Sequence, residues 1–427
     1  MRPRYLLLLL FSSLFLTACS LPGGAPGKVS LSYWGLFEGE DVFKPLLNDY
    51  VSGHSNVTVE YTQKSYSTLA SYKETVLTRL KEGKAGDIVR IHSTWVKELS
   101  PYLAPLPSKV MTKEEYSNTF YPVAREATTV NGEIYGLPLH YDGLLLLANK
   151  KLLDESGVPF PKTWDEFRDV ASKLTRVEGE AKKITRAGAA IGVSSNIPHA
   201  ADILSLMFLQ AGLKIPDDLT SQQAVDALTF YTNFFKVDKV WDESFPSSLV
   251  AFGRGQVVFV FAPSWRILEI KASNPGLEIV AGPPPQVPLE GNTSGDIQLA
   301  SFWLEAVAKS AKSVETAYGL LKFLTSEASQ KKLYALESSK RLFGEAYGRK
   351  DLASTLNGEP YLGPLLGSAG KAKLSLAVDA SGNDLTIEII NRAIADNARG
   401  AEAKLVLENA KKSLQQPGAK PSPSDKN

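Results

Sequence analysis

The stretch NGEIYGLPLHYDGLLLLANKKLLDESGVPFPKTWDEFRDVASKLT (Asn131–Thr175) contains the signals that decide the fold. Within it, the run LLLLANK begins with five consecutive apolar residues, which predicts a strand buried on both faces. A short helix is predicted next, at Leu152–Gly157, and its last residue is a glycine, a common helix terminator. A buried strand followed directly by a helix is typical of proteins that build helices around a central sheet.

A second helix is predicted immediately downstream. Thr163 and Glu166 have the spacing of a capping box, in which each side chain accepts a hydrogen bond from the backbone of the other residue. The apolar face of this helix then contains Trp164, Phe167, Val170 and Leu174. We therefore expect Trp164 to pack in the core and to make no ligand contact.

Strands and helices also alternate upstream of this stretch. Apolar residues alternate with serines from Val29 to Tyr33, which is the pattern of a strand. This strand and its successors are predicted at 29–33, 57–63 and 87–93, with helices at 41–52 and 66–81 between them. Such an order predicts a parallel α/β sheet, which binds ligands at the carboxyl ends of its strands.

The remainder of the chain continues with mixed elements. Helices are predicted at 200–212, 221–236, 313–324, 327–336, 384–398 and 401–414, and strands at 256–262 and 277–285. Thr220 and Gln223 have the spacing of a capping box for the helix at 221–236. The tail at 416–427 is polar and rich in proline, so we expect it to be disordered.

The N-terminal segment MRPRYLLLLLFSSLFLTACS predicts export and lipidation. Its apolar stretch, Tyr5–Leu16, has 12 residues, fewer than the roughly 20 that a membrane-spanning helix needs, so residues 1–18 are typical of a signal peptide. The sequence Leu16-Thr17-Ala18-Cys19 resembles a lipobox, whose cysteine is acylated after cleavage. Residues 19–28 then predict a flexible linker. We expect an extracytoplasmic protein anchored to the cell membrane through Cys19.

Composition excludes several classes of function. The 427 residues include 47 Lys plus Arg and 46 Asp plus Glu, which lacks the basic excess of a nucleic-acid-binding protein. A single cysteine excludes an intramolecular disulfide and any site with several cysteine ligands. The four histidines form no HExxH motif, and no G-x-S-x-G motif occurs. We therefore expect no catalytic activity, no metal and no cofactor.

Four segments carry a resemblance to a known family. Asn131–Thr175 closely resembles the signature region of the family 1 extracellular solute-binding proteins, the receptors of ABC importers, which include maltose-binding protein. Lys84–Leu106, Ala251–Trp265 and Ala311–Tyr334 resemble the same family in the expected order. The chain departs from the family at Ser338–Tyr347, where SSKRLFGEAY replaces the usual Gly-x-x-Pro turn near a crossing between domains.

The resemblance implies an α/β fold of the periplasmic-binding-protein-like type II, with two discontinuous lobes joined by hinge crossovers. By this resemblance, one lobe comprises 29–139 plus 304–338 and the other comprises 142–300 plus 342–415. The ligand would be a carbohydrate bound between the lobes, which close over it by hinge motion. The permease subunits of an ABC importer would recognise the closed form, and we expect the receptor to be a monomer.

The resemblance also indicates candidate ligand contacts. Aromatic rings pack on the C–H faces of sugars, while carboxylates and amides bond to their hydroxyl groups. Trp265 matches a family tryptophan that stacks on a sugar ring, and Asp142 aligns with a family acid that contacts sugar hydroxyls. The full set of expected contacts is Trp34, Glu38, Tyr66, His92, Ser93, Trp95, Tyr141, Asp142, Trp241, Trp265, Trp303, Asn383 and Asp384.

Some of these residues have an equally reasonable structural role. Trp34 also fits a core aromatic, Glu38 a solvated loop acid, and His92 a structural histidine. Tyr141 also fits a residue that packs in the hinge.

Three other functions use the same residues. The aromatics and acids would also form a cage for a cationic ligand such as a polyamine or betaine. A sensing or adhesion lipoprotein without a transporter is a second alternative. An extracytoplasmic glycan-acting enzyme that uses Glu38 and Asp142 as an acid/base pair is the third.

Overall fold

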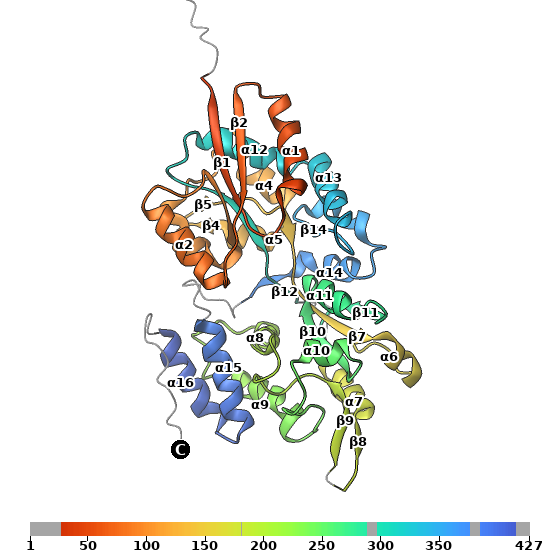
Figure 1. The fold of residues 1–427 in the computed structure, drawn as a ribbon. Helices are drawn as coiled ribbons and strands as arrows, with labels where there is room; N and C mark the ends of the chain where they lie inside the picture. The colour runs from red at the N-terminus through yellow and green to blue at the C-terminus, as the bar shows by residue number, and fades with distance from the viewer. Residues whose placement is uncertain (1–26, 181, 288–296, 376–384, 416–427) are drawn as a thin grey trace, which may run out of the picture.

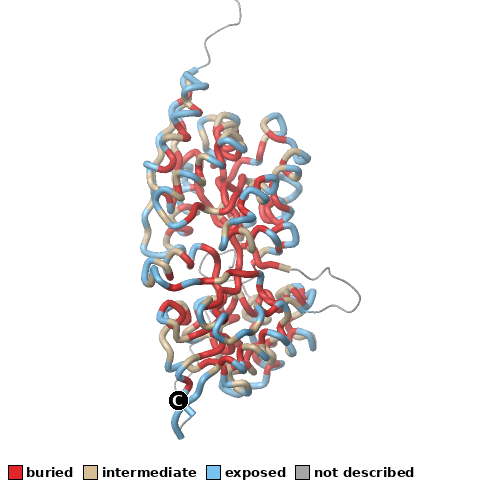
Figure 2. Tube along the Cα trace, turned by 90° about the vertical axis from the view of Figure 1, so that its right-hand side faces the viewer, coloured by how far each residue is buried: buried red, intermediate tan, exposed pale blue. Residues whose placement is uncertain are grey.

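The computed structural model describes residues 27–180, 182–287, 297–375 and 385–415. Two lobes lie one above the other, and segments far apart in the sequence contribute to each of them (Figure 1). Buried residues fill the interior of both lobes and also the segments that join them (Figure 2). The two-lobed α/β fold with discontinuous lobes, expected from the sequence, is confirmed.

The first lobe contains a four-stranded sheet with the order β13-β3-β1-β2. Strands β1, β2 and β3 are parallel, as the sequence predicts, whereas β13 pairs with β3 in the antiparallel direction. Its elements are β1 Val29–Gly35, α1 Glu40–Ser52, β2 Val57–Gln63, α2 Leu69–Lys81, β3 Ile88–His92, η1 Ser93–Trp95, α3 Val96–Leu99, η2 Ser100–Tyr102, α4 Lys113–Thr119, α5 Pro122–Thr128, β4 Thr129–Val130, β5 Glu133–Ile134, β13 Trp303–Val307, α12 Val314–Leu324 and α13 Glu327–Ser338. Because β13 completes the sheet, residues more than 200 positions downstream belong to this lobe.

The second lobe contains a five-stranded sheet with the order β11-β7-β10-β9-β8. All six residues of β7 are buried, which confirms the strand predicted from the LLLLANK run. The elements of the second lobe are β7 Leu144–Asn149, α6 Lys150–Ser156, α7 Trp164–Leu174, β8 Arg176–Glu178, β9 Lys183–Ala189, α8 Ala200–Gln210, α9 Gln222–Lys236, α10 Ser248–Gly253, β10 Val257–Pro263, α11 Trp265–Ser273, β11 Ile279–Gly282, α15 Leu385–Ala398 and α16 Ala403–Gln415. This sheet is mixed, because β7 is antiparallel to both of its neighbours while β9 and β10 are parallel.

Short strand pairs connect the lobes. Strand β6 (His140–Tyr141) pairs with β14 (Ala346–Tyr347), and β12 (Leu299–Ala300) pairs with β15 (Lys373–Leu374). The segment SSKRLFGEAY, where the family turn is missing, therefore ends in a strand of the junction. The other elements near the junction are η3 Lys350–Leu356, α14 Leu362–Gly367 and η4 Ala369–Lys371.

Of the two helix caps predicted from the sequence, the one at α7 is confirmed and the one at α9 is wrong. Thr163 and Glu166 form the predicted capping box of α7, and Trp164 is buried, as expected. The predicted cap of α9 was wrong, because Ser221, and not Thr220, accepts the hydrogen bond from the Ala224 N–H. Both residues are good N-caps, so sequence alone did not distinguish them.

Several expectations fall outside the described residues. These are the signal peptide at 1–18, the lipidation site Cys19, most of the linker, the tail at 416–427, and the candidate contacts Asn383 and Asp384. Within the described ranges, no helix combines the length and the apolar character that crossing a bilayer requires.

Candidate functional site

A cluster of aromatic rings lies at one edge of the first sheet. The ring of Trp303 contacts those of Phe37, His92 and Trp95, with centroid distances of 5.1, 5.2 and 5.2 Å. His92 ends β3, Phe37 follows β1, and Trp303 begins the antiparallel strand β13. All of them therefore lie where the parallel strands end, which is the edge at which α/β sheets bind ligands.

The rings of this cluster form an exposed layer and a buried layer. Phe37 is 50% exposed, and Tyr66 and Trp303 are half-buried. Trp95 and Tyr72 are buried behind them, and Tyr72 contacts Tyr66 at 5.0 Å. The buried rings hold the outer rings in place, so the outer rings present rigid apolar surface to a ligand.

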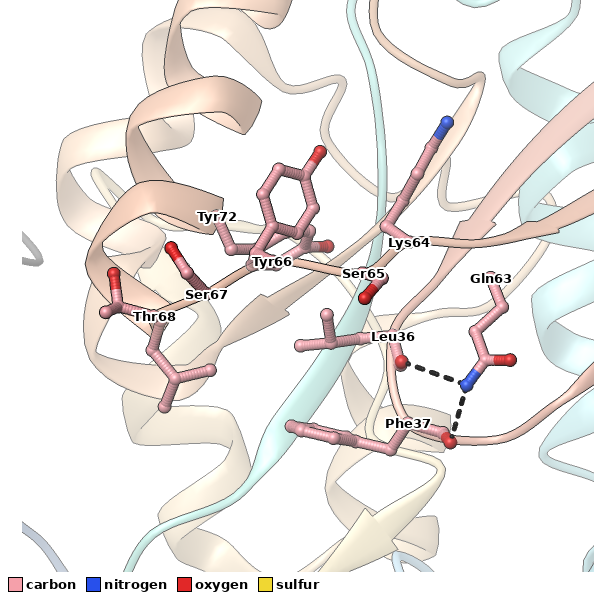
Figure 3. Close-up of a pocket in the computed structure, with 10 residues that line it drawn as sticks. Leu36, Phe37, Gln63, Lys64, Ser65, Tyr66, Ser67, Thr68 and Tyr72 are labelled. Atoms are coloured by element: carbon pink, nitrogen blue, oxygen red, sulfur yellow. Dashed lines mark hydrogen bonds between the residues drawn. The ribbon is translucent and has the colours of Figure 1, made fainter.

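A hollow of about 300 Å³ adjoins the exposed layer, between the ends of β1 and β2 and the start of α2. Figure 3 shows Phe37 and Tyr66 on its border together with several hydroxyl groups. The amide of Gln63 donates hydrogen bonds to the carbonyls of Leu36 (3.5 Å) and Phe37 (2.9 Å), which fixes the loop that carries Phe37. The other polar side chains that line the hollow are those of Lys64, Ser65, Ser67 and Thr68. The hollow thus combines aromatic surface with hydrogen-bonding groups.

His92 is a neutral imidazole behind this surface. Its Nδ1 lies 2.8 Å from the Thr94 Oγ1 and its Nε2 lies 3.0 Å from the Ser301 Oγ. Burial lowers the pKa of His92 to about 4, although the carboxylate of Asp202 in α8 opposes this shift. Because Asp202 belongs to the second lobe, the two lobes face each other at this position.

Replacement of His92 by glutamine is expected to make the free energy of unfolding depend less on pH between pH 7 and pH 4. In the wild type, the unfolded chain gains a proton on His92 near pH 6.5 but the folded chain only near pH 4. Stability conferred by neutral His92 is therefore lost as the pH falls through this window, by roughly 3 kcal/mol at most. Urea denaturation at pH 7, 5.5 and 4.5 measures the slope, and equal slopes for both proteins would contradict the prediction.

Trp265 carries the aromatic surface of the second lobe. It is the first residue of α11 and is 39% exposed. The guanidinium of Arg266 lies 3.9 Å from the centroid of the Trp265 ring. Arg266 Nε also lies 3.4 Å from His199, and His199 Nδ1 lies 2.9 Å from Asp202. Trp265 therefore stands beside a charged and hydrogen-bonding group.

A series of contacts connects Ser264, the residue before Trp265, to the aromatic cluster through the junction. The N–H of Ser264 donates to Asp142 Oδ1 (3.1 Å), and the N–H of Ser301 donates to the carbonyl of Asp142 (3.0 Å). Ser301 in turn contacts His92, which contacts Trp303. Trp265 and the aromatic cluster therefore lie on opposite lobes beside the same crossover.

Asp142 is less available than a typical ligand carboxylate. It is buried, and its Oδ1 also accepts the N–H of Gly143 at 2.7 Å. Burial, with a smaller effect from the charge of Glu345, raises the pKa of Asp142 to about 7. Its Oδ2 is a buried atom with no hydrogen-bond partner among the described residues. Because this oxygen is buried, it presents no accessible surface to a ligand in this structure.

Glu38 does not lie at the surface of the site. It is 5% exposed and forms an ion pair with Arg90, whose Nε also bonds to Glu305 at 2.6 Å. Burial is the largest effect on Glu38 and opposes its ionisation, but the charges of Arg90, His140 and Arg341 together hold the pKa of Glu38 below its usual value. The expected loop acid is therefore part of a buried charge cluster and makes no accessible contact surface.

Four other expected contacts, namely Trp34, Trp241, Ser93 and Tyr141, are not among these exposed rings. Trp34 lies within β1, beneath the ammonium group of Lys64, which is 4.1 Å from the ring centroid. Trp241 is 1% exposed and its indole N–H bonds to Asn196 at 2.8 Å. The remaining two, Ser93 and Tyr141, are buried.

Tyr141 takes the structural role that the sequence left open. Its ring packs against Tyr121 at 4.9 Å, and its hydroxyl group donates to Gln298 at 3.3 Å. The pKa of Tyr141 is raised well above its usual value, first by burial. These contacts place Tyr141 in the packing of the junction.

A second hollow, of about 710 Å³, lies elsewhere on the first lobe. Its lining is mostly proline and aliphatic side chains, with no aromatic ring. It lies at Ala104–Met111 and β5, away from the aromatic cluster. Although this hollow is larger, it lacks the stacking surface that the first hollow has.

Sequence reasoning missed Phe37, His199, Asp202 and Arg266 as residues near the site. Phe37 directly precedes the predicted Glu38, so its position after β1 was an available signal. Arg266 likewise follows Trp265 directly. By contrast, His199 and Asp202 reach the site only through the placement of α8, which no local pattern indicates.

Together, the fold and the site define a two-lobed binding protein of the kind that holds a solute between its lobes. The model of the bacterial extracellular solute-binding protein family matches residues 46–339, and the chain belongs to this family. An uncharacterized lipoprotein in the oleD 5′ region of Streptomyces antibioticus is 29% identical over 185 residues, which cover 41% of this chain and 40% of that relative. The chain therefore matches less than half the length of that relative.

Two further relatives extend the comparison. A multiple sugar-binding protein of Streptococcus mutans serotype c is 23% identical over 357 residues, covering 77% of this chain and 79% of the relative. The crystal structure of a cyclo/maltodextrin-binding protein complexed with maltotetraose has a TM-score of 0.74 at 20% identity. That likeness covers 92% of this chain and 98% of the solved one, and it shows a shared fold.

Proposed function

We propose that this protein is the substrate-binding component of an ABC importer and that it captures a carbohydrate between its lobes. The carrying observation is the position of exposed aromatic rings on both lobes beside one crossover, Phe37, Tyr66 and Trp303 on one side and Trp265 on the other. Such rings pack on the C–H faces of sugars, and the hydroxyl and charged groups around them suit sugar hydroxyls. Relatives whose names or structures include sugars support this proposal.

The proposal includes the mode of action. The lobes comprise 29–139 plus 304–338 and 142–300 plus 342–415, and they close by rotation at the paired crossovers β6/β14 and β12/β15. Ligand contacts made only in the closed form shift the population toward closure, and the permease then reads that form. The receptor acts as a monomer held at the outer face of the cell membrane by lipidated Cys19. The lipoprotein among its relatives supports this anchoring.

The charges around the aromatic rings favour a sugar over a cationic ligand. Arg266 already covers one face of Trp265 at 3.9 Å, and Lys64 lines the hollow beside Phe37 and Tyr66. A polyamine or betaine would have to approach rings that already bear a positive group, which repels it. A neutral sugar instead gains hydrogen bonds from the guanidinium.

The position of the acids favours binding over glycan chemistry. A glycosidase needs two accessible carboxylates on either side of the bond that it cleaves. In this protein Glu38 is buried in its pair with Arg90, and Asp142 is buried with Oδ1 held by two backbone N–H groups. Neither group is placed to reach a glycosidic oxygen.

A thermal-shift panel tests the proposed ligand class. The probes are maltotetraose, maltotriose, mannotriose and tagatose, which solved relatives hold, with spermidine and glycine betaine as the competing class. A sugar at 100 times its dissociation constant is expected to stabilise the protein by about 2.7 kcal/mol. The proposal fails if only the cationic probes raise the melting temperature. Genes for two permeases beside this one would distinguish import from sensing.

A further inference from the structure

Three potential metal ligands meet inside the junction between the lobes. Glu38 follows β1, His140 lies in β6, and Glu337 lies near the end of α13. All three side chains are buried, with exposures of 5%, 7% and 1%. One ligand atom from each lies within 4.8 Å of the others. The cluster belongs to none of the surfaces assigned above to the sugar.

Glu38 Oε1 is a buried oxygen with no hydrogen-bond partner among the described residues. In the same cluster, His140 Nε2 and Glu337 Oε1 lie 2.9 Å apart as an ion pair. Buried polar atoms without partners are costly, and such atoms often mark an ion that completes the site. An ion held by the three residues together would supply the partner that Glu38 Oε1 lacks.

The other oxygen of each carboxylate is already fixed. Glu38 Oε2 pairs with Arg90, and Glu337 Oε2 accepts the N–H of Glu345 at 2.7 Å. Arg341 Nη2 also lies 3.4 Å from Glu337 Oε2. These contacts orient both carboxylates and leave one oxygen of each available, as outer-shell groups do around metal sites.

The charges of the cluster also match a divalent cation. Ion-pair contacts connect four carboxylates, Glu38, Glu305, Glu337 and Glu345, to two guanidinium groups, Arg90 and Arg341. Carboxyl groups therefore outnumber guanidinium groups by two in this set, which favours a bound cation.

We propose that Glu38, His140 and Glu337 bind a divalent transition-metal ion of the zinc class. One imidazole nitrogen and two carboxylate oxygens form a ligand set that zinc accepts, at about 2.0–2.2 Å from each atom. Ligands of one ion are then at most about 4.4 Å apart. Because the three atoms are within 4.8 Å, small side-chain movements suffice to close the site. The ion would connect the first lobe to the crossover.

Metal titration of the intact protein, without sugar, tests this site. After treatment with a chelator, calorimetric titration with Zn²⁺ is expected to give one ion per chain and a higher melting temperature that the chelator reverses. Ca²⁺ should produce neither effect, because it requires more oxygen ligands. Absence of stoichiometric Zn²⁺ binding overturns the proposal. Since sugar is absent, this result is independent of the importer function.

Two variants and a spectroscopic probe complete the test. His140→Gln and Glu337→Gln are expected to lower Zn²⁺ affinity by about tenfold or more, whereas His54→Gln, in the exposed turn after α1, should have no effect. Unchanged affinity in His140→Gln overturns the assignment. If the variants fail to fold, Co²⁺ added to the wild type decides: a strong visible absorption indicates a site with few ligands, and an unchanged aquo-ion spectrum overturns the proposal.

Discussion

Replacement of Arg90 by methionine is expected to lower the free energy of unfolding by about 3–5 kcal/mol. The guanidinium is 2% exposed and is shared by two buried carboxylates, Glu38 and Glu305, the latter at 2.6 Å from Nε. Methionine fills much of the same volume but leaves both acids without a counter-charge. At least one of them must then bind a proton for the chain to fold. Urea denaturation at pH 7 measures the loss.

A surface ion pair provides the matched control for Arg90. Arg79 Nη1 lies 3.1 Å from Glu82 Oε2, and the two side chains are 48% and 41% exposed. Arg79→Met should therefore cost less than about 1 kcal/mol, because water replaces the lost partner. Equal losses in the two variants would contradict the view that burial makes the Arg90 cluster important.

Replacement of Trp265 by alanine is expected to weaken sugar binding by about tenfold or more. The ring is the main exposed aromatic surface on the second lobe beside the crossover. Its removal therefore takes away the aromatic surface that the second lobe is proposed to pack against the sugar. Stability without ligand should change little, since a half-exposed first residue of a helix packs weakly. Isothermal titration with the sugar that gives the largest thermal shift measures the affinity.

Tyr102→Ala is the control for this aromatic substitution. Tyr102 is half-buried on the first lobe, beside Lys81, and belongs to neither the aromatic cluster nor the hollow that adjoins it. Its removal should leave sugar affinity unchanged. A similar loss in Tyr102→Ala and Trp265→Ala would assign the effect to general destabilisation, and unchanged affinity in Trp265→Ala would remove this residue from the site.

Local sequence patterns predicted the elements whose signals are local. Strand β2 has the predicted bounds, Val57–Gln63, because its alternation and its flanking turn residues are both visible in the sequence. The box at Thr163 was equally clear. The pairing of β13 with β3 was not predictable from such patterns, since it joins residues more than 200 positions apart. Only the resemblance to a family indicated that the lobes are discontinuous.

The candidate site also contains some residues that local sequence patterns indicate and others that depend on distant contacts. Tyr66 and Trp303 were identifiable as large aromatics near strand ends, and the structure places both among the exposed rings. The burial of Glu38 depends on its ion pair with Arg90 in the buried strand β3. The sequence around Arg90 does not indicate that this side chain is paired with an acid. The sequence also gave no indication of the candidate metal site. Its ligands at positions 38, 140 and 337 share no local spacing.

A crystal structure of the protein with its best sugar from the thermal-shift panel tests the central claim most directly. We predict sugar density between the lobes, with one ring packed on Trp265 and contacts to Phe37 or Trp303 on the other side. Sugar bound in the larger hollow at Ala104–Met111, or against one lobe with Trp265 untouched, would contradict the account.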